Sequence, residues 1–241
     1  MEVMIDYHCH ILPGLDDGCR SWSEAVEMAR ILAAAGMTCV HCTPHCRCGL
    51  YETLPEQVRD GVQKLRENLH QAGVELQVKA GMEYYLDEFF FDHLDEPLLL
   101  GDSQQLLFEM APNGNIELLK QAVFEIRRRG LTPVLAHPER YPALWVKKRP
   151  CRLAFRQQRR RVALLDEDPL SAFPAIVREL RDMGCLLQGN LGSFSGIYGR
   201  DCSKTAKLLY QGGYYHCFGS DGHSPGQLSK ALANCRAVIS P

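Results

Sequence analysis

The stretch Asp6-Tyr7-His8-Cys9-His10 ends the first apolar segment of this 241-residue chain. Residues two apart on a β-strand point to the same side, about 6 to 7 Å apart along the strand. A strand over residues 1–7 would therefore let His8 and His10 converge on one metal ion. The alternative is two histidines in a loop, so the pair becomes informative only if the same pattern recurs down the chain.

Helix-like and strand-like segments alternate along the sequence. Apolar spacing and closing glycines predict helices over residues 21–35, 54–72, 117–129, 172–183 and 202–211. Strands are predicted over residues 1–7, 37–43, 74–81, 105–108, 131–136, 186–188 and 214–219. This alternation indicates a parallel sheet with right-handed crossovers. The length fits one domain over residues 1–241, of the barrel or doubly wound kind.

Metal-ligating residue types stand at or just beyond the carboxyl ends of these predicted strands. They are His8, His10, His45, Glu83, Glu109, His137, Asp221 and His223, joined by Asp17 from a turn over residues 15–18. A closed α/β barrel would bring them to one face, whereas an open sheet would spread them along an edge. Mixed imidazole and carboxylate ligands suit Zn, Mn or Fe better than Ca or Mg, and nine donors exceed what one ion uses. The sequence therefore predicts two or three divalent transition metals. Asn190 could line the same site or merely cap a turn.

Arg140 follows His137 by three residues, and a guanidinium fork beside a metal cluster is well suited to a phosphate monoester. The alternative is a structural ion pair with Glu139 or Asp17. The sequence has no G-x-S-x-G motif and no Cys-x5-Arg loop that would supply a nucleophile. The chemistry would then fall to water activated by the metals.

Composition narrows the class of protein. The 27 basic and 29 acidic side chains give a net charge of −2, which argues against electrostatic capture of nucleic acid. The sequence shows no leader pattern and no apolar run of about 18 residues, so we expect a cytoplasmic protein without membrane insertion. The eleven cysteines are scattered and odd in number, which favours reduced thiols. A zinc site in the dense segment 39–48 is disfavoured because Cys39 and Cys42 would face opposite sides of a strand.

Several motifs together carry a resemblance to a known family. They are His8-Cys9-His10, Leu15-Asp16-Asp17-Gly18, Thr43-Pro44-His45, Gly81-Met82-Glu83-Tyr84-Tyr85, Ala136-His137-Pro138-Glu139-Arg140-Tyr141, Gln188-Gly189-Asn190 and Ser220-Asp221-Gly222-His223. In this order they resemble the polymerase and histidinol phosphatase (PHP) superfamily. Within it they are most similar to the bacterial protein-tyrosine phosphatases encoded with capsule and exopolysaccharide genes.

The resemblance implies a distorted seven-stranded (β/α)7 TIM-like barrel with three metals. By position, the first metal would be held by His8, His10, Glu83 and Asp221, the second by Glu83, Glu109 and His137, and the third by Asp17, His45 and His223. Arg140 matches the arginine that holds substrate phosphate, and we assign it the catalytic role together with Asp221. Manganese is the favoured metal, with iron and zinc as alternatives.

The function implied is hydrolysis of phosphotyrosine on a protein, in particular on a bacterial tyrosine autokinase that controls polysaccharide export. One alternative is a small-molecule phosphatase such as histidinol phosphatase, and another is a weakly active PHP-fold regulator that binds metal. The aromatic residues Tyr84, Tyr85 and 89–91 could form a wall for a phenyl ring or pack in the core. Two features depart from the family pattern: residues 146–169 look like a basic insertion, and residues 224–228 lack the second basic residue usual after the last Asp-x-His.

Overall fold

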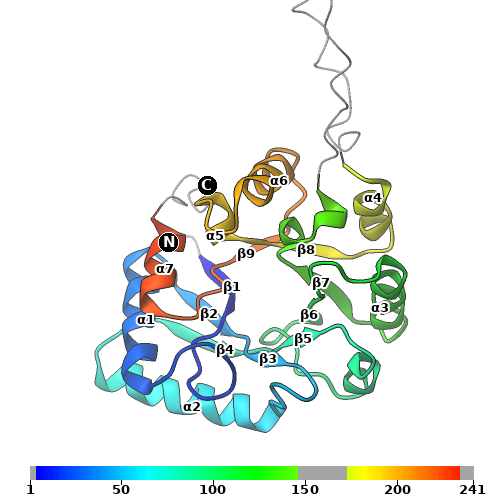
Figure 1. Cartoon of the computed structure of the whole chain (residues 1–241). Helices are drawn as coiled ribbons and strands as arrows, with labels where there is room; N and C mark the ends of the chain where they lie inside the picture. Colours follow the sequence, from blue (N-terminus) through cyan, green and yellow to red (C-terminus); the bar gives the residue numbers. More distant parts are fainter. Residues whose placement is uncertain (1–3, 146–172, 234–241) are drawn as a thin grey trace, which may run out of the picture.

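Parallel strands grouped in two sheets lie at the centre of the molecule (Figure 1). The computed structural model describes residues 4–145 and 173–233. The strands in this part of the chain are β1 (Ile5–Cys9), β2 (Cys39–Cys42), β3 (His45–Cys46), β4 (Gln77–Ala80), β5 (Glu83–Tyr85), β6 (Gln105–Glu109), β7 (Thr132–Ala136), β8 (Leu186–Asn190) and β9 (Cys217–Gly219). One sheet has the order β1-β2-β4 and the other the order β3-β5-β6-β7-β8-β9. All pairings between these strands are parallel.

Backbone contacts join the end of the second sheet to the first. Cys9 forms a parallel bridge with Gly222, and the amide of Asp221 donates to the carbonyl of His8 at 2.7 Å. The strands thus curl into a ring that helices surround (Figure 1). The predicted TIM-like α/β architecture is confirmed in this coarse form.

The predicted count of seven strands is not confirmed. The strands predicted over residues 37–43 and 74–81 correspond to β2 and β4, whereas β3 and β5, which follow after Thr43-Pro44 and Gly81-Met82, had not been predicted. Proline lacks a backbone N–H and so cannot donate in a ladder. The interruption leaves His45 and Glu83 at the start of short strands that belong to the second sheet, paired with each other.

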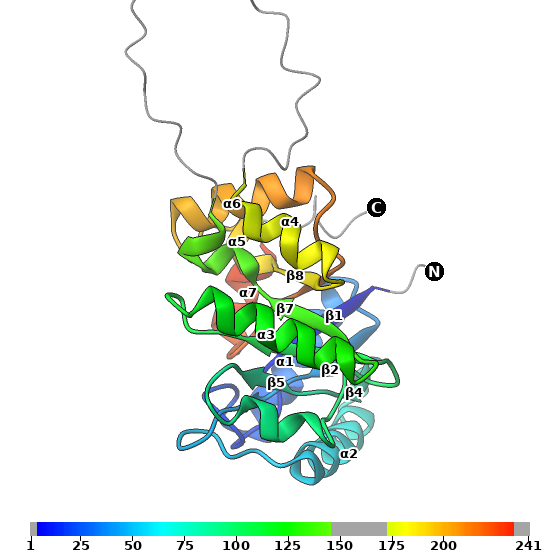
Figure 2. The same ribbon diagram turned by 90° about the vertical axis from the view of Figure 1, so that its right-hand side faces the viewer.

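Helices cover the outside of the strands. They are α1 (Trp22–Ala34), α2 (Pro55–Gln71), α3 (Ile116–Arg128), α4 (Ala175–Asp182), α5 (Leu191–Phe194), α6 (Arg200–Gln211) and α7 (Pro225–Leu232), with 3-10 turns η1 (Phe90–Leu94), η2 (Pro138–Arg140) and η3 (Pro142–Leu144). Figure 2 shows α3 and α4 lying outside β7 and β8. The five predicted helices correspond to α1, α2, α3, α4 and α6, whereas α5 and α7 had not been predicted.

Helix α1 illustrates why these segments fold as predicted. The Ser21 side chain accepts a hydrogen bond from the Glu24 amide at the N-terminus. Its buried side chains, Ala25, Met28, Ala29 and Leu32, recur at helical spacing and pack against the core. Gly36, just beyond the helix, has φ +93°, which a residue with a side chain rarely adopts.

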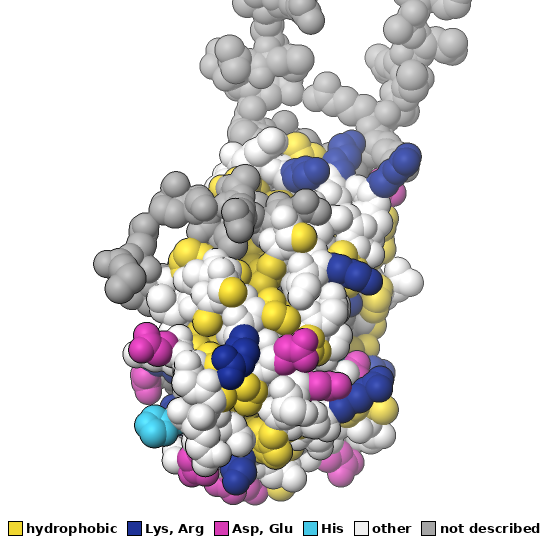
Figure 3. Space-filling model, turned by 90° about the vertical axis from the view of Figure 1, so that its left-hand side faces the viewer, with side chains coloured by type: hydrophobic (Ala, Val, Ile, Leu, Met, Phe, Trp, Pro, Cys, Tyr) yellow, Lys and Arg dark blue, Asp and Glu magenta, His cyan; other side chains and the backbone are white. Residues whose placement is uncertain are grey.

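Three further observations bear on the sequence expectations. None of the helices in the described ranges is both long and apolar enough to cross a membrane. The predicted insertion at residues 146–169 lies outside the described residues. Figure 3 shows acidic and basic side chains interspersed over the face that it draws, as the near-balanced charge of the sequence suggests.

Candidate metal centre

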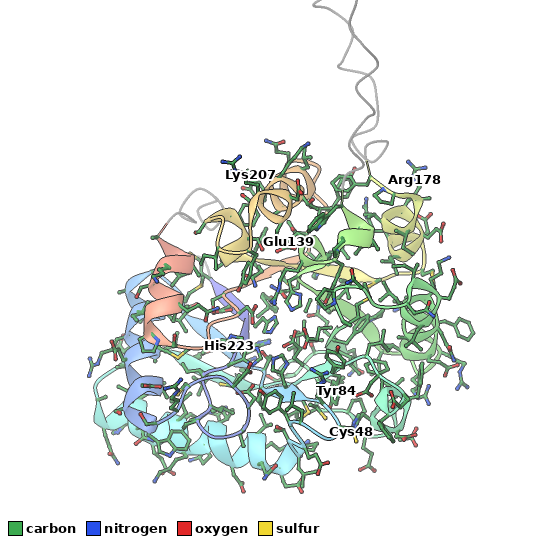
Figure 4. The ribbon with its side chains drawn as sticks, viewed as in Figure 1. Cys48, Tyr84, Glu139, Arg178, Lys207 and His223 are labelled. Carbon is green, nitrogen blue, oxygen red and sulfur yellow. The ribbon has the colours of Figure 1, made fainter. Side chains whose placement is uncertain are left out.

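All nine predicted metal ligands come together at the carboxyl-terminal end of the strands. His8 lies within β1 and His10 just beyond it; His45 and Glu83 begin β3 and β5; Glu109 ends β6; His137 follows β7; Asp221 and His223 follow β9; and Asp17 lies in the loop before α1. Figure 4 shows His223 on the inner side of the ring. The alternative of an open edge with scattered side chains is wrong, because the curled sheet brings these ends together.

Glu83 lies at the centre of this cluster and is fully buried. Its Oε2 atom is 3.0 Å from His8 Nε2, 3.4 Å from His10 Nε2 and 3.0 Å from His45 Nδ1. Its Oε1 atom is 3.2 Å from His137 Nε2. Oε2 has no hydrogen-bond partner of acceptable geometry among the described residues. A buried carboxylate ringed by four imidazoles is the arrangement expected of a ligand shared between cations.

Residues outside the predicted set orient the two histidines of the opening motif. His8 Nδ1 lies 3.0 Å from the side-chain oxygen of Gln188, and His10 Nδ1 lies 2.6 Å from Oδ2 of Asp16. Both oxygens are acceptors, so each Nδ1 carries the proton and each Nε2 presents a lone pair. The two Nε2 atoms are 3.0 Å apart and face the same point as Oδ1 of Asp221, which is 3.6 and 3.4 Å away. Such facing lone pairs fit a cation between them.

The remaining predicted ligands extend the cluster toward solvent. Asp17 Oδ1 is 3.6 Å from Nε2 of both His45 and His223, and it is half exposed. Glu109 lies 3.3 Å from His45 Nδ1 and 3.6 Å from His137 Nε2. Four sets of side chains each have ligand atoms within 4.8 Å of one another: His10, Asp17, His45 and His223; His8, Glu83 and His137; His8, His10 and Asp221; and His45, Glu83 and Glu109. No cysteine of the described ranges belongs to such a set, and the nine described cysteines are free thiols.

Two of these residues have a strained backbone. Within the described chain, His137 with φ 34° and Asp221 with φ 50° are the residues other than glycine that have positive φ. This region costs energy for residues with a side chain and often marks a functional site. Both strained residues belong to the predicted site, and their backbone conformation directs their side chains into the cluster.

Arg140 is held by the same carboxylate that faces the histidines. Its Nη1 atom donates to Oδ2 of Asp221 at 2.8 Å, and its guanidinium lies 4.6 Å from the ring centroid of Tyr198. The alternative, an ion pair of Arg140 with Glu139 or Asp17, is wrong. Glu139 is buried and accepts hydrogen bonds from the Asn190 amide and the Tyr215 hydroxyl, and Asp17 lies beside His45 and His223.

Asn190 combines the two roles that the sequence left open. Its side-chain oxygen accepts from the Gly192 amide at the start of α5, and its Nδ2 donates to Oδ2 of Asp221 at 2.7 Å. Tyr198 adds a weaker hydroxyl contact of 3.4 Å to the same oxygen. Sequence reasoning missed Tyr198 because it lies on the short connection between α5 and α6, far from any predicted strand end.

The electrostatics reflect the crowding of opposite charges. Burial, the largest single influence, opposes ionisation of Glu83 and Asp221, yet His8 and the other cationic neighbours together outweigh it and hold the pKa of both carboxyls well below the usual range. Burial and the adjacent charge of Glu83 raise the pKa of Glu109 to about 7. Burial also works against a charged His8, but Glu83 and Asp221 raise its pKa to about 9. Protons on these imidazoles therefore balance the buried carboxylates, and a bound cation would displace the proton from Nε2.

A pocket of about 270 Å³ opens over the cluster. Its walls include His223, Arg140, Tyr141, Tyr85 and Arg47. Of the aromatic residues considered as a wall for a phenyl ring, Tyr85 lines this pocket. Tyr84 and Phe90 are instead buried in the core.

The fold and the cluster define a parallel TIM-like α/β protein with a candidate metal centre at the carboxyl ends of its strands. The family described as capsular polysaccharide synthesis, CpsB/CapC, matches residues 4–152 and 170–241. The chain belongs to this CpsB/CapC family.

Several characterised proteins are similar to the chain. The tyrosine-protein phosphatase YwqE of Bacillus subtilis is 29% identical over 223 residues, covering 92% of this chain and 78% of the relative. The tyrosine-protein phosphatase CpsB of Streptococcus pneumoniae is 27% identical over 228 residues, covering 92% of this chain and 83% of the relative. A chain from the crystal structures of YwqE and CpsB, described as metal-dependent tyrosine phosphatases, matches with a TM-score of 0.77 and 25% identity over 99% of this chain and 88% of that chain. Histidinol phosphate phosphatase from Lactococcus lactis shares the fold at 12% identity, with a TM-score of 0.54 over 98% of this chain and 92% of its own.

Proposed function

We propose that this chain is a metal-dependent phosphatase that hydrolyses phosphotyrosine on proteins. The observation that carries the proposal is the position of Glu83, whose two carboxylate oxygens lie 3.0 to 3.4 Å from four histidines, two of which, His45 and His137, line an open pocket. Membership of the CpsB/CapC family and similarity to named tyrosine-protein phosphatases support the substrate class.

The nine clustered side chains would hold two or three divalent transition metals. We assign the first site to His8, His10, Glu83 and Asp221, the second to Glu83, Glu109 and His137, and the third to Asp17, His45 and His223, with manganese as the favoured metal. When bound, such metals supply Lewis acidity and activate water at neutral pH. Asp16 and Gln188 keep His10 and His8 in the tautomer that presents Nε2 to a cation.

Arg140 would bind the phosphate group of the substrate. Asp221 engages one of its guanidinium nitrogens, and stacking against Tyr198 fixes the plane of the group. The remaining N–H groups can donate to phosphate oxygens and to the charge that develops during transfer. A side chain that is anchored before the substrate arrives loses little entropy on binding.

The pocket suits an aryl phosphate more than an alkyl phosphate. Tyr85, Met110 and Pro112 line it and can contact a phenyl ring. The phenolate of tyrosine, whose conjugate acid has a pKa of about 10, leaves more readily than the alkoxide of serine or histidinol. We infer that the physiological substrate is a bacterial tyrosine autokinase that controls capsule or exopolysaccharide synthesis. The cytoplasmic location of the protein stays a prediction.

Selectivity tests this function. With Mn present, kcat/KM should be highest for a phosphotyrosine peptide, and lower by at least tenfold for the matched phosphoserine peptide and for histidinol phosphate, because the ratio reports differential transition-state binding. A preference for histidinol phosphate would move the chain to small-molecule phosphatases. Metal binding without turnover of any of the three would favour a regulator.

A further inference from the structure

Strand pairing places a second layer of side chains above the predicted metal ligands. His45 pairs with Glu83, and Cys46 with Tyr84, in the parallel register of β3 and β5. Arg47 follows His45 by two residues, and Tyr85 follows Glu83 by two. Residues two apart share a side of the strand and stand about 6 to 7 Å apart. Arg47 and Tyr85 therefore lie one step above the ligand layer, on the same side, and both line the pocket.

Arg47 is fixed in this position. Its guanidinium lies over the ring of Tyr85, 4.1 Å from the centroid, which is a favourable cation–π distance. Its backbone amide donates to the Tyr51 carbonyl, and its carbonyl accepts from the Tyr51 amide, both at 2.8 Å, so residues 47–51 form a narrow turn. Gly49 takes the φ of +74° that this turn requires. The ring of Tyr51 in turn stacks on His45, with centroids 5.7 Å apart.

The guanidinium of Arg47 has no carboxylate partner within the described part of the protein. Arg140 pairs with Asp221, but no carboxylate of the described residues forms an ion pair with Arg47. Asp17 and Glu109 line the same pocket, yet they pair with histidines. The five N–H donors of an arginine that stacks on an aromatic face remain able to bind a carboxylate in bidentate fashion.

We propose that Arg47, stacked on Tyr85, selects substrates that carry an acidic side chain next to the phosphotyrosine. This rests on the proposed function. The phosphate would lie at the ligand layer beside Arg140, and the phenyl ring separates it from the peptide backbone. A cation one strand step higher faces the residues that flank the phosphotyrosine rather than the phosphate. Arg47 is thus a specificity-determining residue at the mouth of the pocket.

The test compares three phosphotyrosine peptides that differ only in having glutamate, glutamine or lysine beside the phosphotyrosine, with phenyl phosphate as a substrate without flanking groups. The full chain should prefer the glutamate peptide over the glutamine peptide by about tenfold in kcat/KM (about 1.4 kcal/mol), mainly through KM, because a charge-assisted hydrogen bond is stronger than a neutral one. Arg47→Gln should abolish this preference, and it should lower kcat/KM for the glutamate peptide about tenfold more than kcat/KM for phenyl phosphate. Arg47→Glu should invert it in favour of a lysine-flanked peptide. Arg59→Gln, which removes an exposed charge from α2, should behave like the wild type.

Equal kcat/KM for the glutamate and glutamine peptides in the wild type would overturn the proposal. So would an Arg47→Gln variant that loses kcat on phenyl phosphate as much as on the peptides, because Arg47 would then act on the phosphate. Fluorescence anisotropy of the labelled peptides separates this result from failure of the proposed function. If no aryl phosphate is turned over, the function is wrong, while tighter binding of the glutamate peptide that depends on Arg47 would still support the role of Arg47.

Discussion

Oδ2 of Asp221 accepts a 2.8 Å hydrogen bond from Arg140, while Oδ1 of the same carboxylate lies 3.4 Å from Nε2 of His10. One side chain therefore connects the predicted phosphate-binding arginine to the predicted metal ligands. Asn190 shares Oδ2 with the arginine, so the orientation of the carboxylate does not depend on Arg140 alone.

Removing Arg140 should impair catalysis more than folding. Arg140→Ala is expected to lower kcat by about 10² to 10³, the cost of losing one charge-stabilising donor. Metal content should be retained because Asn190 still orients Asp221. Steady-state kinetics on a phosphotyrosine peptide, elemental analysis and thermal unfolding measure the three quantities, with the exposed Arg20→Ala as control. A fully active or unfolded Arg140→Ala protein would count against the assignment.

Asp16 should act through His10. An asparagine at this position can place its NH₂ group where Oδ2 now accepts from His10 Nδ1, which disfavours the required tautomer. Asp16→Asn is therefore expected to weaken metal binding about 10- to 100-fold, as loss of such outer partners typically does. Competition with a chelating dye gives the affinity, and the exposed Asp60→Asn serves as control. Unchanged affinity would show that the 2.6 Å contact has no role in metal binding.

The number of metals bound per chain should match the number of predicted metal sites. Protein purified after growth with Mn, Fe or Zn is expected to contain two or three metals per chain by elemental analysis. Glu83→Gln should lower that number, because this carboxylate lies within 3.4 Å of four histidines. Less than one metal per chain in the wild type would rule out the multinuclear centre.

His41 gives the stability a pH dependence that is separate from the metal centre. Burial, and to a smaller extent Lys79, lower its pKa to about 4, and its Nδ1 has no partner among the described residues. The unfolded chain takes up a proton below about pH 6.5 that the folded chain takes up only near pH 4, so stability is lost as the pH falls through that window. The contribution amounts to about 2 kcal/mol between about pH 7 and pH 5. Urea unfolding at the two pH values should show that His41→Leu loses less stability than the wild type, and an equal loss would contradict the assignment.

Periodicity and strand ends were sufficient to predict which side chains lie together in the cluster. His8 and His10 follow an apolar strand, His137 and Asp221 do the same, and parallel strands of a curled sheet end on one side. These rules need no long-range information. They could not predict the division of β2 from β3 at Pro44, because a strand is defined by its partner and β3 pairs with β5 in the other sheet.

The partners of the ligands could not be predicted from the sequence. Asp16 and Asp17 are adjacent in one turn, and only the folded loop shows that Asp16 binds His10 while Asp17 faces His45. Gln188 belongs to one of the motifs, but only the folded sheet shows that its oxygen lies beside His8, and Tyr198 stands outside every motif. The two strained residues, His137 and Asp221, are also set by tertiary structure rather than by local propensity.

The most direct test of the account is turnover of a phosphotyrosine peptide before chelation, after chelation and after return of Mn. The account predicts activity in the first sample, loss of at least 95% (roughly 1.8 kcal/mol or more) in the second and recovery in the third, because the reaction depends on the centre built by His8, Glu83 and Asp221. Full turnover by protein that elemental analysis shows to be free of metal would contradict it.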